Sequence, residues 1–210
     1  MSTHRRKGFR RKVEFEERNH FIVISMEGAE TEPKYFGAFC TPRDGKTQIK
    51  LVPNPNHKSN PKDVLQRLKV FFNKKGYSNN NGDKGWMVID RDSWTEDELN
   101  QVHRQAREAG FSVALSNPCF ELWLYLHLHD WKSFCDRGEC QRSLAELLCG
   151  YSSRTKGGYD VSKLMPGVKH AINRARSNDL ESQDLWPRGQ TTKVYLLVQQ
   201  LLDEPQVHEI

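Results

Sequence analysis

The chain has 210 residues, of which 36% are hydrophobic and 28% charged, with a formal net charge of +5. The length predicts one domain with additions. The absence of any apolar run near the ~20 residues of a membrane span argues against a helical membrane protein, and the clustering of the apolar residues argues against a disordered chain. The expected protein is folded and cytoplasmic, with its five cysteines as reduced thiols.

The positive charge is concentrated at the N-terminus. The first twelve residues contain six of the 32 basic residues and no acidic residue, which leaves 26 basic against 27 acidic residues in the rest of the chain. Residues 1–19 are therefore expected to form a basic arm that can bind nucleic acid electrostatically; the alternative is a solvated tail that keeps the protein soluble. The nucleic-acid-binding candidates in this arm are Arg5, Arg6, Lys7, Arg10, Arg11 and Lys12.

Four short apolar runs predict strands at residues 20–26, 47–52, 86–90 and 111–115. A helix is expected between each pair, so strands and helices alternate. This alternation is typical of a parallel sheet with helices on both faces. We therefore predict an α/β domain over residues 20–129, with a parallel sheet of about four strands flanked by helices.

Helix-start signals agree with this alternation. Thr31-Glu32-Pro33 is expected to start the first helix, with Pro in the first turn, and Asn60 to cap the second, with Pro61 at its first position. Ser93 and Thr95 each precede a glutamate by three residues, so two capping boxes are available for the third helix.

After residue 116 the pattern changes. Asn117-Pro118 is expected to cap a strongly apolar, buried helix at residues 120–128. Beyond it only helices are predicted, so residues 130–210 are interpreted as a helical C-terminal extension. These helices are expected at residues 143–149, with a Ser143/Glu146 capping box, at 162–176 and at 192–202.

Carboxylates follow two of the predicted strands. Glu27 comes after the strand at 20–26, and Asp90 and Asp92 come at the end of the strand at 86–90. In a doubly wound sheet these two strands are neighbours, and ligands bind outside their carboxyl ends. Three such carboxylates suit Mg²⁺ and metal-assisted phosphoryl transfer. The alternative is that they are ordinary capping or surface acids.

Glu27-Gly28 after the first strand and Asp90-Arg91-Asp92 after the third together resemble the Toprim domain, over roughly residues 20–116. That domain occurs in topoisomerases, primases and nucleases of the overcoming-lysogenization-defect type. The resemblance implies a phosphodiester substrate, Mg²⁺ or Mn²⁺ bound by the two aspartates, and Glu27 as the general acid/base. Topoisomerase activity is disfavoured, because the chain has no room for the further domain that carries a strand-breaking tyrosine.

A longer resemblance is to the RloB-like family. Its strings are Glu27 to Phe36, the Asp90-Arg91-Asp92 motif, Ser116-Asn117-Pro118-Cys119-Phe120-Glu121-Leu122-Trp123 with Leu126-His127, and Thr191 to Val194. Members of this family are associated with restriction and abortive-infection loci, often beside an ATPase. The resemblance therefore implies a role in anti-phage defence with a partner ATPase.

Further candidates surround this centre. Glu121, near the start of a buried helix, is expected to be an additional metal ligand or to bridge to Arg91; the alternative is an acid favoured by the helix dipole. Two roles are open for Ser116 and Asn117: they bind the substrate, or they cap the following helix. The substrate-binding candidates are Lys34, Arg91, Ser116, Asn117 and Lys156.

The sequence thus predicts metal-dependent phosphodiester hydrolysis of DNA or RNA in anti-phage defence, controlled by a partner ATPase, with Glu27, Asp90 and Asp92 as catalytic residues and Glu121 as a further metal ligand. Two alternatives stay open. One is a non-catalytic module that binds nucleic acid or a partner protein, and the other is metal-dependent processing of a nucleotide or small signalling molecule. Assembly into a homo-oligomer also stays open.

Overall fold

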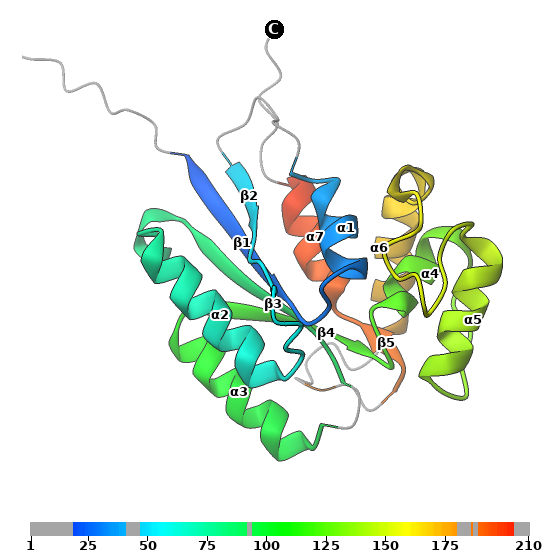
Figure 1. The fold of residues 1–210 in the computed structure, drawn as a ribbon, viewed down its shortest axis with the longest axis horizontal. Helices are drawn as coiled ribbons and strands as arrows, with labels where there is room; N and C mark the ends of the chain where they lie inside the picture. The colour runs from blue at the N-terminus through cyan, green and yellow to red at the C-terminus, as the bar shows by residue number, and fades with distance from the viewer. Residues whose placement is uncertain (1–18, 41–46, 92–93, 180–185, 187–188, 204–210) are drawn as a thin grey trace, which may run out of the picture.

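A computed structural model describes residues 19–40, 47–91, 94–179, 186 and 189–203. At its centre is a sheet with the strand order β2-β1-β3-β4-β5 (Figure 1). The first four strands run parallel, and β5 is antiparallel to β4. The predicted α/β class is confirmed, with five strands where about four were expected. The strands are β1 (His20–Met26), β2 (Thr47–Leu51), β3 (Lys84–Asp90), β4 (Phe111–Asn117) and β5 (Thr191–Thr192).

Helices cover both faces of the sheet (Figure 1). Helices α2 and α3 lie along one face, α1 and α7 along the other, and α4, α5 and α6 gather at the side of β5. None of the described helices is long and apolar enough to cross a membrane. The α-helices are α1 (Thr31–Gly37), α2 (Pro61–Lys74), α3 (Glu96–Glu108), α4 (Glu121–Leu128), α5 (Arg137–Leu147), α6 (Val168–Asn178) and α7 (Val194–Asp203), and short 3-10 turns lie at Asn79–Asn81, Val161–Lys163 and Met165–Gly167.

Strand β1 shows why its apolar run is continuous. Successive side chains of a strand point to opposite faces, so Ile22 and Ile24 pack into the core under α1 and α7, whereas Val23 packs under α2 and α3. Because helices cover both faces, both sets of side chains are buried. The sheet thereby separates two hydrophobic clusters.

Helix α4 is buried on every side except at its last residue. Trp123 and Leu124 are fully buried, and the helix packs against α5 and α6. Its side chains belong to the same hydrophobic cluster as Ile24 of β1 and Leu197 of α7. The core on this face is therefore continuous from the sheet to the C-terminal helices.

The start of α5 differs from the prediction. The helix begins at Arg137 rather than Ser143, because the carboxylate of Asp136 caps it by accepting the N–H of Glu139 at 2.7 Å. Ser143 is a buried residue inside the helix, so the predicted Ser143/Glu146 capping box is wrong.

The capping role predicted for Asn117 is also wrong. Asn117 is the last residue of β4, joined to Pro118 by a cis peptide bond, and α4 begins after Phe120 without a side-chain cap. The helix predicted at 162–176 begins only at Val168, because Pro166, which has no N–H, lies in a preceding 3-10 turn.

The expectation that only helices follow residue 130 is wrong at one position. Thr191 and Thr192 pair with Asn117 and Ser116 as β5, and α7 begins two residues later. A strand of two residues has no periodicity of its own, so only its pairing with β4 identifies it.

Candidate active site

The sheet order places the ends of β1 and β3 side by side, as predicted. Met26 is aligned with Val88, and the N–H of Glu27 donates to the Val88 carbonyl at 3.0 Å. The N–H of Asp90 in turn donates to Oε2 of Glu27 at 3.1 Å. The Glu27 and Asp90 carboxylates therefore emerge together at the carboxyl ends of the parallel strands, where α/β proteins bind ligands.

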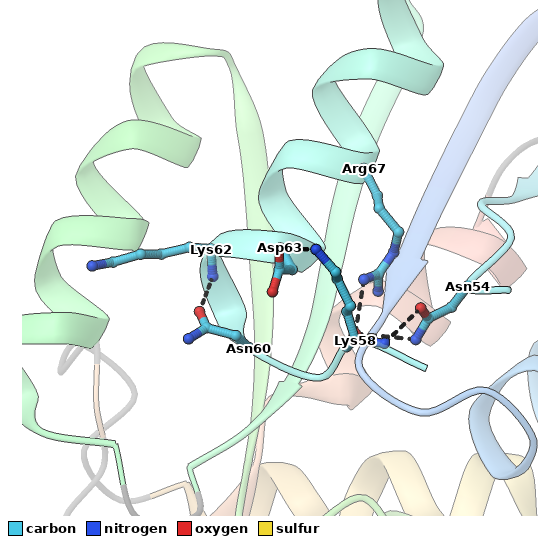
Figure 2. A network of polar contacts seen from close by, with 6 residues as sticks. All are labelled: Asn54, Lys58, Asn60, Lys62, Asp63 and Arg67. Carbon is cyan, nitrogen blue, oxygen red and sulfur yellow. Dashed lines mark hydrogen bonds and ion pairs between the residues drawn. The ribbon is translucent and has the colours of Figure 1, made fainter. Parts of the chain in front are cut away.

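Side chains from the loop between β2 and α2 and from α2 hold the backbone at Glu27 in place, and Figure 2 shows how Asn54 and Arg67 also bond to Lys58 of this loop. Asn54 donates from Nδ2 to the carbonyls of Glu27 and Lys58, each at 3.1 Å. Arg67 of α2 donates to the carbonyls of Met26 at 2.6 Å and Lys58 at 2.8 Å. Two consecutive carbonyls at the end of β1 are thus hydrogen-bonded to side chains, which fixes the backbone that carries the Glu27 carboxylate.

A pocket of about 340 Å³ lies at these strand ends. Carboxylates dominate its wall, and two basic side chains and an imidazole face the same space. The residues that line it are Glu27, Gly28, Ala29, Glu30, Thr31, Glu32, His57, Ser59, Asp90, Phe120, Glu121, Arg137 and Lys156.

Asp90 has the most unfavourable environment for a charge in this pocket. It is 4% exposed, and burial raises its pKa well above the usual range, with further contributions from the negative charges of Glu27, Glu32 and Glu121. Arg137 partly offsets them through an ion pair of 3.2 Å to Oδ2. A buried carboxylate among like charges has a high affinity for a cation.

Glu32 is a pocket residue that the sequence analysis treated only as part of a helix start. It is 6% exposed, and its Oε1 accepts the N–H of Gly28 at 2.9 Å. Burial raises its pKa, and the charge of Glu121 adds to the shift. The sequence feature that could have identified Glu32 is its position in the first turn of α1, the helix that follows Glu27.

Gly28→Ala is expected to displace the Glu32 carboxylate, because a Cβ at position 28 would overlap it. The obstacle is the end of a flexible side chain, so the fold should survive while the affinity for Mn²⁺ falls roughly tenfold, a loss typical of removing a supporting contact at a metal site. Calorimetric titration with Mn²⁺ measures this, with Gly37→Ala as the control because its Cβ would meet no atom within 4 Å. Equal affinities for the two variants would contradict the expectation.

Glu121 reaches the same pocket from the start of α4 and is 3% exposed. Its Oε1 accepts hydrogen bonds from the Tyr151 hydroxyl at 2.7 Å and from Nε2 of Gln141 at 3.2 Å. Burial and the negative charge of Glu121 raise the pKa of Tyr151, which remains a hydrogen-bond donor. Arg91, the partner suggested for Glu121, ion-pairs with Glu96 at 3.5 Å.

Of the predicted substrate-binding residues, only Lys156 lines the pocket. Lys34 lies beside it and donates from Nζ to the carbonyl of Gly157 at 2.7 Å, which ties α1 to the loop that carries Lys156. The hydroxyl of Ser116 is buried against Thr192, with their oxygens 2.8 Å apart.

Asn117 and Arg91 are likewise not among the residues that line the pocket. Asn117 donates from Nδ2 to the carbonyl of Gly189 at 2.9 Å, so it braces the approach to β5. Asp92 and the six basic residues of the N-terminal arm lie outside the described residues.

Three residues of the pocket were not among the residues named from the sequence. Arg137 comes from the first turn of α5, and His57 and Ser59 come from the loop between β2 and α2. His57 has φ of 51°, a left-handed conformation that is uncommon for residues other than glycine and often found at functional sites. No local sequence pattern predicts that any of these three residues lies in the pocket.

The donor chemistry of the pocket fits Mg²⁺ or Mn²⁺, because both ions prefer carboxylate oxygens. Across residues 19–40, 47–91, 94–179, 186 and 189–203, however, no three His, Cys, Asp or Glu side chains are grouped closely enough to hold an ion as they stand. Asp90 would be the first ligand, with Glu121 or Asp92 completing the set, and Glu27 would be either a further ligand or the general base.

Comparison with known proteins identifies the family. A family model described as RloB-like protein matches residues 22–201, which includes all the described residues that line the pocket. No curated protein and no solved structure matches the chain. Because the match covers most of the sequence, the chain belongs to the RloB-like family.

Proposed function

We propose that this protein hydrolyses phosphodiester bonds of nucleic acid with the help of Mg²⁺ or Mn²⁺. The observation that carries the proposal is the buried Asp90 carboxylate beside Glu27, in a pocket that also contains Glu32 and Glu121. Such a cluster is costly for a folded protein unless a cation compensates it. The resemblance to the Toprim domain supports the same chemistry.

The side chains divide into roles by their environment. Asp90 and Glu121, with Asp92, would hold the metal, and Glu32 would support them. The half-buried Glu27, whose carboxylate is oriented by the N–H of Asp90, would accept the proton of the attacking water. When bound, the metal would neutralise charge on the phosphate and lower the pKa of its water.

We propose anti-phage defence in the cytoplasm as the setting, on the resemblance to RloB-like proteins of restriction and abortive-infection loci. A partner ATPase encoded beside this chain would control the cleavage. The basic residues between Arg5 and Lys12 would add electrostatic affinity for the nucleic acid backbone.

The size of the pocket favours a second candidate. A volume of about 340 Å³ lies within the range of small-molecule sites. The same carboxylates would then process a nucleotide or a small signalling molecule instead of a polymer. The two candidates differ in substrate and share the metal chemistry.

One assay separates these candidates. Labelled single- and double-stranded DNA, RNA and mononucleotides are incubated with Mn²⁺, Mg²⁺ or EDTA, with and without the partner ATPase. Wild type and the control Glu108→Gln, an exposed carboxylate of α3, are expected to cleave a polymer. Glu27→Gln is expected to be slower by roughly 10²–10⁴-fold, the range for loss of a general base.

The other outcomes are equally informative. Turnover of mononucleotides alone would favour the second candidate. Equal rates for wild type and Glu27→Gln would contradict the assignment of the catalytic residues. No calorimetric signal with Mn²⁺, together with salt-sensitive nucleic acid binding that is lost on deleting residues 1–12, would favour a non-catalytic module.

A further inference from the structure

Arg137 enters the pocket because of where α5 begins. Asp136 caps the helix, so Arg137 is its first residue. From there the guanidinium reaches Oδ2 of Asp90 at 3.2 Å. The Arg137 side chain is 36% exposed, whereas that of Asp90 is 5% exposed. One end of this ion pair is thus buried, and the other lies at the mouth of the pocket.

The charges around the pocket do not balance. Five carboxylates line it, and among the described lining residues the lysine and arginine side chains are Arg137 and Lys156. A phosphate that enters such a space is repelled unless a cation meets it. Arg137 suits this task, because the planar guanidinium offers several N–H donors that match two phosphate oxygens at once.

A divalent cation and the Arg137 guanidinium compete for the same carboxylate. Both are counter-ions of Asp90, and a divalent ion carries twice the charge at a shorter contact distance. Were such an ion held by Asp90, the ion pair between Asp90 and Arg137 would break, while the guanidinium would stay at the mouth of the pocket. There it would be placed to bind an anion.

We infer that Arg137 is a substrate-binding residue: it occupies Asp90 in the metal-free protein, and it binds a phosphate of the substrate once a divalent cation has replaced it. The inference deepens the proposed function and rests on it. It also gives the C-terminal part of the chain a direct role in the site, since α5 supplies the phosphate ligand.

Two binding measurements test the inference without relying on turnover. The variants are Arg137→Gln and, as a matched control on the same helix, Arg142→Gln, whose side chain is exposed. Calorimetry with Mn²⁺ alone is expected to show equal or tighter binding for Arg137→Gln, because a competitor has been removed. Arg142→Gln should match wild type.

The second measurement is fluorescence anisotropy of a short labelled DNA or RNA oligonucleotide in Ca²⁺. Arg137→Gln is expected to bind it roughly ten- to a hundredfold more weakly, the range for losing a charge-assisted hydrogen bond. Arg137→Lys, which keeps the charge but loses the planar fork, should recover part of the affinity. Melting curves check that all variants are folded.

The outcomes distinguish this inference from the proposed function. Oligonucleotide binding that depends on Arg137, without cleavage in Mn²⁺, would contradict the nuclease proposal and support the inference. Cleavage by wild type with normal binding by Arg137→Gln would overturn the inference alone. Weaker binding of both Mn²⁺ and the oligonucleotide by a folded Arg137→Gln would also overturn it, since Arg137 would then organise the metal site. A wild type that binds neither would overturn both.

Discussion

Asp90→Asn is expected to lower the rate of metal-dependent cleavage at least 100-fold and, at the same time, to raise the melting temperature of the metal-free protein. The activity falls because a central metal ligand is lost. Stability rises because the substitution removes a negative charge that is buried beside Glu27, Glu32 and Glu121. An asparagine can still accept a hydrogen bond from Arg137. The gain should be about 0.5–2 kcal/mol, as for other relieved functional sites.

The pH dependence follows from the raised pKa of Asp90. A carboxyl group whose pKa is raised by folding contributes stability that is fully present below its unfolded pKa and is lost as the pH rises through its folded pKa. As the pH rises from acid toward neutral, metal-free wild type should therefore lose more stability, or gain less, than Asp90→Asn. The difference in melting temperature between them should be small in acid and grow toward neutral pH.

Melting curves in EDTA, recorded from acid to neutral pH, measure the effect. In a parallel series of curves, added Mn²⁺ should stabilise wild type more than the variant. Asp97→Asn is the control, because this carboxylate of α3 is exposed and its loss should change stability by less than about 1 kcal/mol. A lower melting temperature for metal-free Asp90→Asn would contradict the expectation that the Asp90 carboxylate destabilises the metal-free protein.

Trp123→Ala is expected to lower the free energy of unfolding by about 3–5 kcal/mol. Trp123 is fully buried in α4, and its ring lies edge-on to Tyr35 of α1 and His127. Removing the indole leaves a cavity where the sheet and the C-terminal helices meet. For a chain of this size the melting temperature should fall by roughly 6–20 °C.

Trp131→Ala is the matched control, because Trp131 is 38% exposed and should cost less than about 0.5 kcal/mol. The same curves test how the chain is divided. A single transition that moves to lower temperature would show that residues 20–129 and 130–210 unfold together around α4. A transition that splits in two would show that the C-terminal helices fold separately.

The parts of the fold that the sequence predicted are those with local causes. The run from His20 to Met26 is apolar enough to be a strand buried on both faces, and Asn60 before Pro61 caps α2 through a bond of 2.8 Å to the N–H of Lys62. Alternation of such elements then leads to a parallel sheet. The usual strand order of doubly wound sheets also predicted that β1 and β3 are neighbours. Glu27 and Asp90 were therefore expected to lie close together.

The failures came from contacts between distant segments. β5 exists because Thr191 and Thr192 pair with β4, some 75 residues earlier in the chain, and no local pattern in two threonines reports that pairing. The start of α5 at Arg137 was not predicted, because Ser143 and Glu146 have the spacing of a capping box. Only the burial of Ser143 inside the helix excludes that capping box.

For the candidate site, the sequence by itself determined the chemistry: carboxylates at two strand ends, and the family strings that contain them. The tertiary structure decided which of those groups share a pocket and what charge state their surroundings favour. Glu32, Glu121 and Arg137 line the pocket of Asp90 from three different helices, and burial raises the pKa of Asp90. Burial and charge proximity are properties of the packed chain, because they depend on which segments exclude water from one another, and spacing along the sequence does not encode them.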